Sequence, residues 1–182
     1  MADPHIQENL DRWDKLTISI YRFGMLLTFF ALSGLALQQL FYPLWFKESL
    51  IFLALATLLQ ASSLHLYNKA IRLLLVNACW FGVWLSAVSF TLSGLLAAYL
   101  SLGLLSVTLA GIAFKESFCF SLASLKLVPV ILVCTWGAVV ASLGEWAAGG
   151  FFITALLYLY MAWKKINMPL YYDLGDRSKY EI

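Results

Sequence analysis

Charged side chains are scarce in this chain, and long uncharged stretches separate them. Only 12% of the 182 residues are Asp, Glu, Lys or Arg, whereas 62% are hydrophobic and the mean hydropathy is +0.83. A soluble domain has about a quarter charged residues and about half apolar ones. This composition therefore excludes an ordinary soluble fold, and it leaves no room for a separate soluble catalytic domain.

Residues that carry enzyme chemistry are also few. The chain has two histidines and three cysteines, and it lacks an HExxH motif, paired aspartates, a serine–histidine–acid set and a phosphate-binding glycine loop. We interpret Cys79, Cys119 and Cys134 as reduced, buried hydrophobic residues, because their spacing fits neither a metal site nor a full disulfide set. We therefore expect no enzyme, no catalytic residue and no metal site, and an enzyme acting on lipid ranks third among the functions considered.

The apolar stretches predict an all-α polytopic membrane bundle with about six transmembrane helices. Residues 1–22 are expected to form a cytoplasmic amphipathic segment, residues 23–163 the transmembrane domain and residues 164–182 a cytoplasmic tail. Within the first segment, residues 3–20 fit a helix lying on the membrane or a solvated leader packed on the bundle. The predicted spans cover residues 23–41, 49–67, two helices within 73–114 that turn near Thr91, Ser93 and Gly94, then 122–143 and 147–163.

The fifth span is ambiguous, because Lys126 and Pro129 fall inside its apolar run. One interpretation is a single tilted helix over residues 122–143, preceded by Lys115 and Glu116, which end the fourth span. The other has a short interfacial segment at residues 117–126 and a span starting near Val128. We favour the first, because residues 129–143 alone are too short to cross a hydrocarbon core of about 30 Å.

Basic residues alternate between the predicted loops in a way that gives an orientation. Eleven of the 12 Lys and Arg residues lie on one side of the six-span arrangement, and Lys47 alone lies on the other. Because cytoplasmic loops are enriched in Lys and Arg, both termini are expected in the cytoplasm. The segment Phe46-Lys47-Glu48-Ser49 also recurs at residues 114–117, which leaves a weak 3+3 inverted repeat as an open alternative.

A few side chains are candidates for binding. His65 and Gln60 are weak candidate ligands for the metal of chlorophyll or another tetrapyrrole, although each has a more ordinary role at a helix end or between helices. Trp80 and Trp84 lie one turn apart and suit packing within the bundle or against a partner, lipid or pigment. Further partner-binding or structural candidates are Lys115, Glu116, Cys119 and Lys126.

The stretch Gly111-Ile-Ala-Phe-Lys-Glu-Ser-Phe-Cys-Phe120 contains a Lys-Glu-x-Phe-Cys segment. With the six-span plan and the polar tail after Trp163, it resembles a family of uncharacterised integral membrane proteins of cyanobacteria and plastids, over nearly the whole chain. That resemblance implies the thylakoid or plasma membrane of a cyanobacterium and a role beside the photosystems, such as photosystem II assembly. It brings no catalytic residues with it.

The leading functional hypothesis is a non-enzymatic accessory protein that binds other membrane subunits or pigments, with the bilayer as its surroundings and no nucleic-acid partner. It rests on the expectation of a bundle without buried charge and of a polar tail, which is either a partner surface or disordered. The alternative is a small transporter or channel for a neutral solute or an ion. The polar side chains available to a transport path are Gln38, Gln60, Asn77 and Thr135.

Reporter fusions test the span count and the orientation together. Fusions after Gly94 and after Lys164 should report opposite faces of the membrane, with the reporter after Lys164 in the cytoplasm. An odd number of crossings between these two points would place both reporters on one face and contradict the six-span arrangement.

Overall fold

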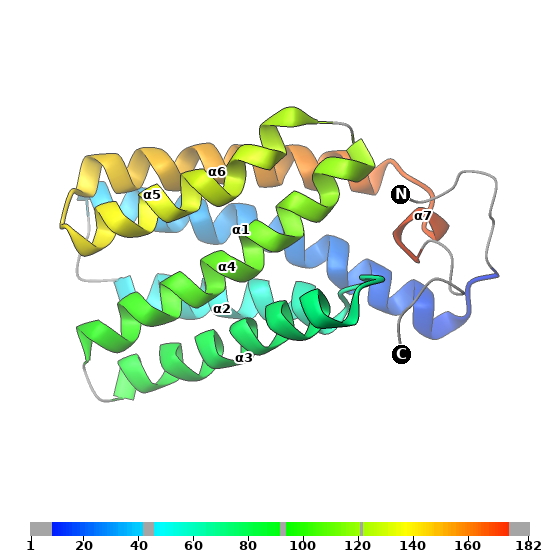
Figure 1. Cartoon of the computed structure of the whole chain (residues 1–182). Coiled ribbons are helices and arrows are strands. Elements are labelled where there is room, and N and C mark those ends of the chain that lie inside the picture. Colours follow the sequence, from blue (N-terminus) through cyan, green and yellow to red (C-terminus); the bar gives the residue numbers. More distant parts are fainter. Residues whose placement is uncertain (1–8, 42–45, 92–93, 121, 175–182) are drawn as a thin grey trace.

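The computed structural model describes residues 9–41, 46–91, 94–120 and 122–174, and all regular elements in these ranges are helical. The longer helices lie alongside one another (Figure 1). They are α1 (Arg12–Phe41), α2 (Phe46–Ser62), α3 (Lys69–Thr91), α4 (Leu95–Phe120), α5 (Val128–Val140) and α6 (Gly144–Ile166). A 3₁₀ helix, η2 (Ala123–Leu127), precedes α5, and the four-residue helix α7 (Tyr171–Leu174) follows α6. The predicted all-α fold is confirmed for the described residues.

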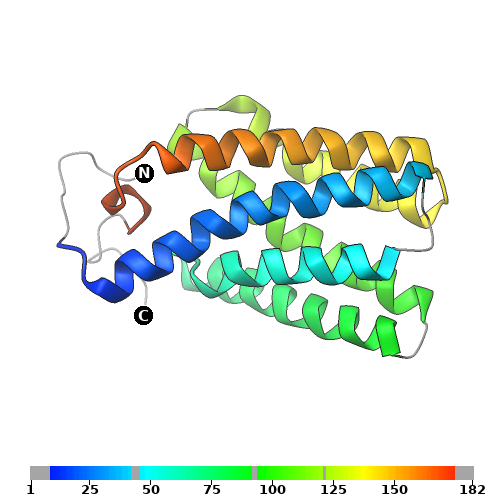
Figure 2. The ribbon, with the colours of Figure 1, turned by 180° about the vertical axis from the view of Figure 1, so that it is seen from behind.

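The six longer helices form a closed ring. Each packs on the next with antiparallel direction, and α6 returns to pack along α1 (Figures 1 and 2). Contacts between α2 and α4 cross the interior of the ring. The core there is built from aliphatic and aromatic side chains, including Leu32, Leu35, Leu53, Leu105, Phe151 and Met161. The ring brings the first and last helices of the chain side by side.

The outer surface of the bundle is also apolar. Large side chains such as Phe81, Trp84 and Val133 are each more than 60% exposed, which is the arrangement expected where lipid replaces water around a helix bundle. By length and composition, α1, α3, residues 95–119 of α4 and α6 can each cross a bilayer. The 17-residue α2 and the 13-residue α5 are shorter. The chain is a helical membrane bundle, while the count of six crossings stays a prediction.

The first helix begins at a capped end. Asp11 Oδ1 accepts a hydrogen bond from the Arg12 amide at 2.6 Å, and Asp14 Oδ2 accepts one from the Asp11 amide at 2.9 Å, so side-chain oxygens satisfy two N–H groups that have no partner within the helix. From there α1 continues unbroken to Phe41. The structure therefore has no break at residue 22 between the predicted amphipathic segment and the first span. Residues 1–8 of that prediction lie outside the described residues.

Two predictions around the fifth span are wrong. The fourth helix does not end at Lys115 and Glu116 but continues to Phe120, because Glu116 points into the bundle instead of into water. The favoured single helix over residues 122–143 is replaced by η2 and by α5, which starts at Val128. Pro129 lies in the first turn of α5, where a missing N–H breaks no intrahelical bond.

The structure agrees with the predicted turn near Gly94 but does not show the predicted repeat. Thr91 ends α3 and Gly94 directly precedes α4, as the predicted turn requires, while Ser93 lies outside the described residues. The two copies of the recurring segment occupy unlike positions, since Phe46 begins α2 whereas Phe114 lies inside α4. The inverted repeat is therefore not shown.

Close packing of α1 on α2 depends on a glycine. A Cβ atom on Gly24 would lie 2.8 Å from Gln60 Cγ and 3.2 Å from the Ala56 carbonyl oxygen. At this point Gln60 Nε2 donates hydrogen bonds to Thr28 Oγ1 at 2.6 Å and to the Gly24 carbonyl at 3.3 Å. The amide of Gln60 thus joins α2 to α1. The two helices can approach this closely because Gly24 has no side chain.

The contact between α3 and α4 is built in the same way. Ser101 Oγ donates to the Gly82 carbonyl at 2.7 Å, and Thr108 Oγ1 donates to the Leu75 carbonyl at 3.1 Å. Gly111 leaves room for Leu75, whose side-chain carbons would clash with an added Cβ. Small and hydroxyl-bearing residues are the usual means of joining helices in lipid, where the hydrophobic effect gives little drive for association.

A pair of glycine substitutions in α1 tests this packing. Gly24→Ala should destabilise the fold by about 1 to 3 kcal/mol through overpacking, measured as a lower thermal unfolding midpoint in detergent. Gly34→Ala is the matched control, because an added Cβ there meets nothing within 4 Å. Equal shifts for the two variants would contradict the proposed close approach of α1 and α2.

Candidate functional site

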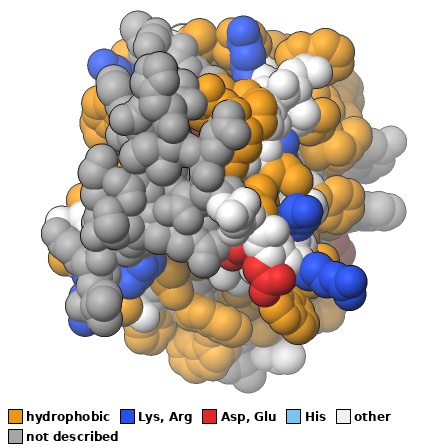
Figure 3. All heavy atoms as spheres, turned by 90° about the vertical axis from the view of Figure 1, so that its right-hand side faces the viewer, with side chains coloured by type: hydrophobic (Ala, Val, Ile, Leu, Met, Phe, Trp, Pro, Cys, Tyr) orange, Lys and Arg blue, Asp and Glu red, His pale blue; other side chains and the backbone are white. Residues whose placement is uncertain are grey.

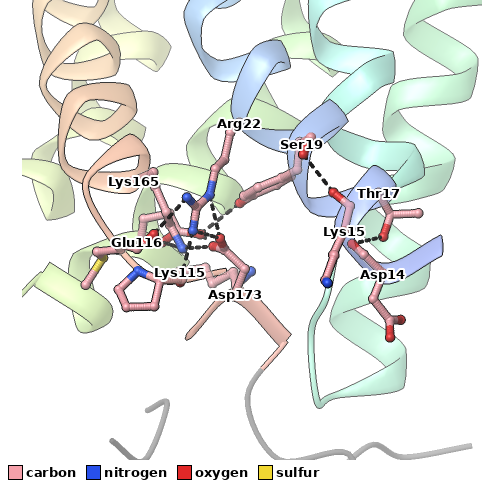
Figure 4. Close-up of polar contacts among 12 residues, drawn as sticks. Asp14, Lys15, Thr17, Ser19, Arg22, Lys115, Glu116, Lys165 and Asp173 are labelled. Atoms are coloured by element: carbon pink, nitrogen blue, oxygen red, sulfur yellow. Dashed lines mark hydrogen bonds and ion pairs between the residues drawn. The ribbon is translucent and has the colours of Figure 1, made fainter. Parts of the chain in front are cut away.

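Five charged side chains from four helices meet at one end of the bundle (Figure 4). We call them the charge cluster: Arg22 of α1, Lys115 and Glu116 of α4, Lys165 of α6 and Asp173 of α7. The side chains of Glu116, Lys165 and Asp173 are at most 2% exposed. Figure 3 faces this end, where Lys and Arg side chains border apolar surface.

Lys165 is the centre of the cluster. Its Nζ lies 2.9 Å from Glu116 Oε2 and also donates to Asp173 Oδ1. An ammonium in an apolar interior is very costly unless it is paired and hydrogen-bonded. Lys165 therefore ties α6 to α4 on one side and to α7 on the other.

Arg22 holds the chain that follows α6. Its Nε and Nη2 donate to Asp173 Oδ2 at 2.8 and 2.6 Å, while Nη1 and Nη2 donate to the carbonyls of Met168 and Pro169 at 2.9 and 3.1 Å. The Arg22 guanidinium thus binds both the Asp173 side chain and the turn that precedes Asp173. Arginine suits this role because its donors have a fixed, planar geometry. The result is a folded segment over residues 167–173.

Two tyrosines add further polar contacts between the helices. Tyr21 donates from its hydroxyl to Glu116 Oε1 at 2.8 Å, and Lys115 Nζ lies 3.5 Å from the same oxygen. Lys115 also lies 5.2 Å from the centroid of the Tyr21 ring, within the range of a cation–π contact. One turn or more into the bundle, Tyr158 donates to the Leu109 carbonyl at 2.7 Å and joins α6 to α4.

The charges in the cluster do not cancel. Three cations, Arg22, Lys115 and Lys165, face two carboxylates, Glu116 and Asp173, so the formal sum is +1. The bundle itself contributes all three cations and one carboxylate, and the second carboxylate arrives on α7. The balance of charge at this end therefore depends on the position of α7.

Helix periodicity explains why these residues point inward. Glu116 follows Leu109 and Ile112 on the buried face of α4, and Lys165 follows Tyr158 at a spacing of seven on the buried face of α6. The neighbouring Lys164 is exposed, because one residue along a helix rotates the side chain by about 100°. This continuation of the buried stripe is the signal that sequence reasoning missed.

The expectation of a bundle without buried charge is wrong. Glu116 was predicted to end the fourth span and Lys165 to lie in the cytoplasmic tail, yet both are buried near the ends of helices that are candidate spans. The interpretation of the tail as disordered is also wrong for Asp173, which is 7% exposed. A hydropathy profile treats each charged residue separately. The fold pairs opposite charges that are far apart in the sequence, such as Arg22 and Asp173, which are 151 residues apart.

The tetrapyrrole candidates are not brought together as a ligand pair. Gln60 is fully buried between α1 and α2, where its amide donates to Gly24 and Thr28. The prediction that His65 lies within a span is wrong, because α2 ends at Ser62 and His65 lies in the irregular stretch before α3. Pigment binding stays a prediction.

The tryptophan candidates lie on the outside of the bundle. Trp80 and Trp84 are 58% and 62% exposed on α3, so of the two expected roles the structure does not show packing within the bundle. Asn77 is also exposed and precedes Trp80 by one turn on the same face. Its side-chain amide has no hydrogen-bond partner among the described residues.

The remaining candidates are scattered. Lys126 is exposed on η2, with its Nζ 5.3 Å from the centroid of the Phe118 ring, and Cys119 is half-buried on α4. Cys79 is buried as expected, but the expected burial of Cys134 is wrong, because its face of α5 points outward. All three cysteines are free.

An open groove of about 600 Å³ lies along α5 and α6. It is lined mainly by small and apolar residues, with Glu145 as its one acidic side chain. Hydrolytic or transfer chemistry needs several converging polar groups. The groove does not provide such a set, and the charge cluster is the place where ionisable groups converge in the described residues.

An apolar outer surface, a closed ring of helices and a charge cluster sealed at one end define a helical integral membrane protein. Sequence comparison places the chain more closely: it belongs to the family described as "Uncharacterized integral membrane protein (DUF2301)", whose match covers residues 88–182. That region includes most of the charge cluster.

A relative from Haemophilus influenzae, described as "Uncharacterized protein", is 38% identical over 185 residues and aligns over 100% of both chains. No solved structure matches the chain. The expected family of uncharacterised integral membrane proteins is thus shown, but its expected restriction to cyanobacteria and plastids is not.

A double-mutant cycle tests the pairing at the centre of the cluster. Glu116→Gln and Lys165→Met should each destabilise the protein by about 3 to 5 kcal/mol, because each leaves a buried charge without its partner. The double variant should lose much less than the sum, since Arg22 and Asp173 remain paired. Thermal unfolding in detergent measures the cycle, with Lys164→Gln as the exposed control; additive losses would show that the two side chains do not interact.

Proposed function

We propose that this protein is a membrane accessory protein that binds a transmembrane helix of another membrane protein along the outer face of α3. The observation that carries the proposal is the exposed Asn77 amide on a face that otherwise consists of large apolar side chains. The partner helix is defined by its chemistry: a polar side chain that can bond an amide, with small residues beside it.

The position of Asn77 along α3 makes its exposure costly in lipid. At a rise of about 1.5 Å per residue, Asn77 lies about 12 Å from the start of α3 at Lys69. If α3 is centred in a hydrocarbon core of about 30 Å, this places the amide near the middle of the core. A polar group there lacks water and is stabilised by a hydrogen bond from a neighbouring helix.

The surroundings of Asn77 suit a helix contact. Only 28% of the apolar window of α3 is buried, against 44% to 50% for the other three candidate spans, so α3 is the least covered of these helices. Trp80 and Trp84 extend the same face by one and two turns and offer broad surfaces for packing. A partner helix laid along α3 would cover all three side chains.

The orientation belongs to the same proposal. Arg22, Lys115 and Lys165 meet at one end of the bundle, whereas Lys47 lies in the first turn of α2, at the opposite end. The preference of basic residues for the cytoplasm supports a cytoplasmic charge cluster and cytoplasmic termini. Neither comparison ties the family to photosynthetic membranes, so the proposed partner is defined by its helix and not by a photosystem.

Transport of a small neutral solute or an ion is the second candidate function. The charge cluster favours it, because ionisable groups within membrane helices commonly mark ion or proton paths. A liposome flux that the unaltered protein carries and that Asn77→Leu leaves unchanged would support transport and count against the accessory role.

Site-directed photocrosslinking in native membranes tests the proposed partner face. A benzoylphenylalanine placed at Phe81, which is 61% exposed next to Trp80, should crosslink to a peptide inside a transmembrane helix that carries a polar side chain. Asn77→Leu should lower this yield about three- to tenfold, the range expected for one hydrogen bond between helices, and Asn77→Gln should retain most of it.

The matched control is a probe at Phe152 on α6, whose crosslinks should not change with Asn77. Adducts from Phe81 only to lipid would contradict a protein partner on this face. Adducts only to a second copy of the chain would replace the proposed accessory role by self-association.

A further inference from the structure

The Asp173 carboxylate is bound by three donors from two helices of the bundle. Arg22 Nε and Nη2 donate to Oδ2, and Lys165 Nζ donates to Oδ1, so both carboxylate oxygens are engaged. The side chain is 2% exposed. A guanidinium and an ammonium that converge on two oxygens of one anion are the groups with which proteins recognise carboxylates and phosphates.

The donors and the anion belong to different parts of the fold. Arg22 and Lys165 lie on α1 and α6, which pack along each other, whereas Asp173 lies on the four-residue α7. The turn that carries α7 is held by two further Arg22 bonds, to the Met168 and Pro169 carbonyls, and by the Met168 amide, which donates to the Lys165 carbonyl at 3.0 Å. The donors are therefore part of the bundle, and the anion is part of a short appended segment.

The other carboxylate of the cluster does not need these donors to the same extent. Glu116 receives the Tyr21 hydroxyl and the Lys115 ammonium at Oε1, in addition to Lys165 at Oε2. Without Asp173, three cations would face Glu116 alone, a formal sum of +2 in a buried site. Such a site favours any anion that can enter it.

We propose that Arg22 and Lys165 form an anion-binding site that α7 fills with Asp173, and that a phosphate group displaces this carboxylate and releases α7. The ligand class is a phosphate or phosphomonoester, whose oxygens match the three donors. The site lies at the end of the bundle where lipid headgroups would meet the helix ends, so a lipid headgroup and free phosphate are the two sources of the same chemistry. This inference is independent of the partner face on α3.

Asp173→Asn in the full-length protein tests whether Asp173 competes with the ligand. Native mass spectrometry of protein in phosphatidylcholine nanodiscs, with and without phosphatidic acid, and with inorganic phosphate at matched ionic strength, measures binding. Removing the built-in competitor should tighten phosphate-group binding about tenfold or more, and Arg22→Gln in the Asp173→Asn background should abolish the gain. Asp11→Asn is the matched control, because it removes an exposed negative charge near the same end and keeps a capping side chain.

A second measurement uses the unaltered protein and does not depend on how the variants fold. Chymotrypsin cleaves after the half-buried Tyr171 and Tyr172 of α7, and their cleavage should become several-fold faster when phosphate displaces Asp173. Acceleration by phosphatidic acid alone identifies a lipid headgroup, and acceleration by inorganic phosphate as well identifies a soluble anion; both support the site. Equal binding gains for Asp173→Asn and Asp11→Asn, or a cleavage rate that no phosphate source changes, would overturn it.

Discussion

The Lys165 ammonium, held between Glu116 and Asp173, is the constraint on which the arrangement of the bundle end depends. A buried charge is tolerated only when its partners are within hydrogen-bond reach, so α4, α6 and α7 must end at matching depths. Arg22 adds α1 to the same requirement by binding Asp173 and the turn before it. The ring closes where α6 packs along α1, and the charge cluster lies at one end of this contact. The position of α6 along α1 is therefore specified by charge as well as by packing.

Away from that end, the bundle relies on close backbone approach. Gly24 lets α1 approach α2, and Gly111 lets α4 approach α3, while Gln60 and Thr108 place hydrogen bonds across these contacts. Apolar area alone would not hold such helices together in lipid, because the tails of the lipids are as apolar as the side chains they would replace. Small residues and polar bonds thus hold the helix contacts together, and the large apolar side chains divide between the core, as Phe151 and Tyr158 do, and the outer surface, as Phe81 and Trp84 do.

Composition and hydropathy were sufficient to predict the class of fold, because the uncharged run over residues 73–114 has few structural alternatives. Helix ends were harder to predict. The pair Lys115 and Glu116 looks like an interfacial stop, yet α4 continues to Phe120 because Glu116 finds Lys165 and Tyr21 inside the bundle. The site was missed for the same reason: its members are far apart in sequence, and only the inward stripes of α4 and α6 hinted that their last polar residues face the core.

Glu116 and Asn77 are polar residues in two different settings: Glu116 has partners within the fold, and Asn77 is exposed on the face where a partner is proposed. Both are polar groups on membrane helices, where an unmet hydrogen bond is costly. For Glu116 the chain supplies partners from three other residues, so its polarity is used in holding the fold. For Asn77 the described chain supplies none, and its face is turned away from the bundle. An amide at that position gains a hydrogen bond only from something outside the described chain, and for this reason the proposed partner face lies on α3 and not at the charge cluster.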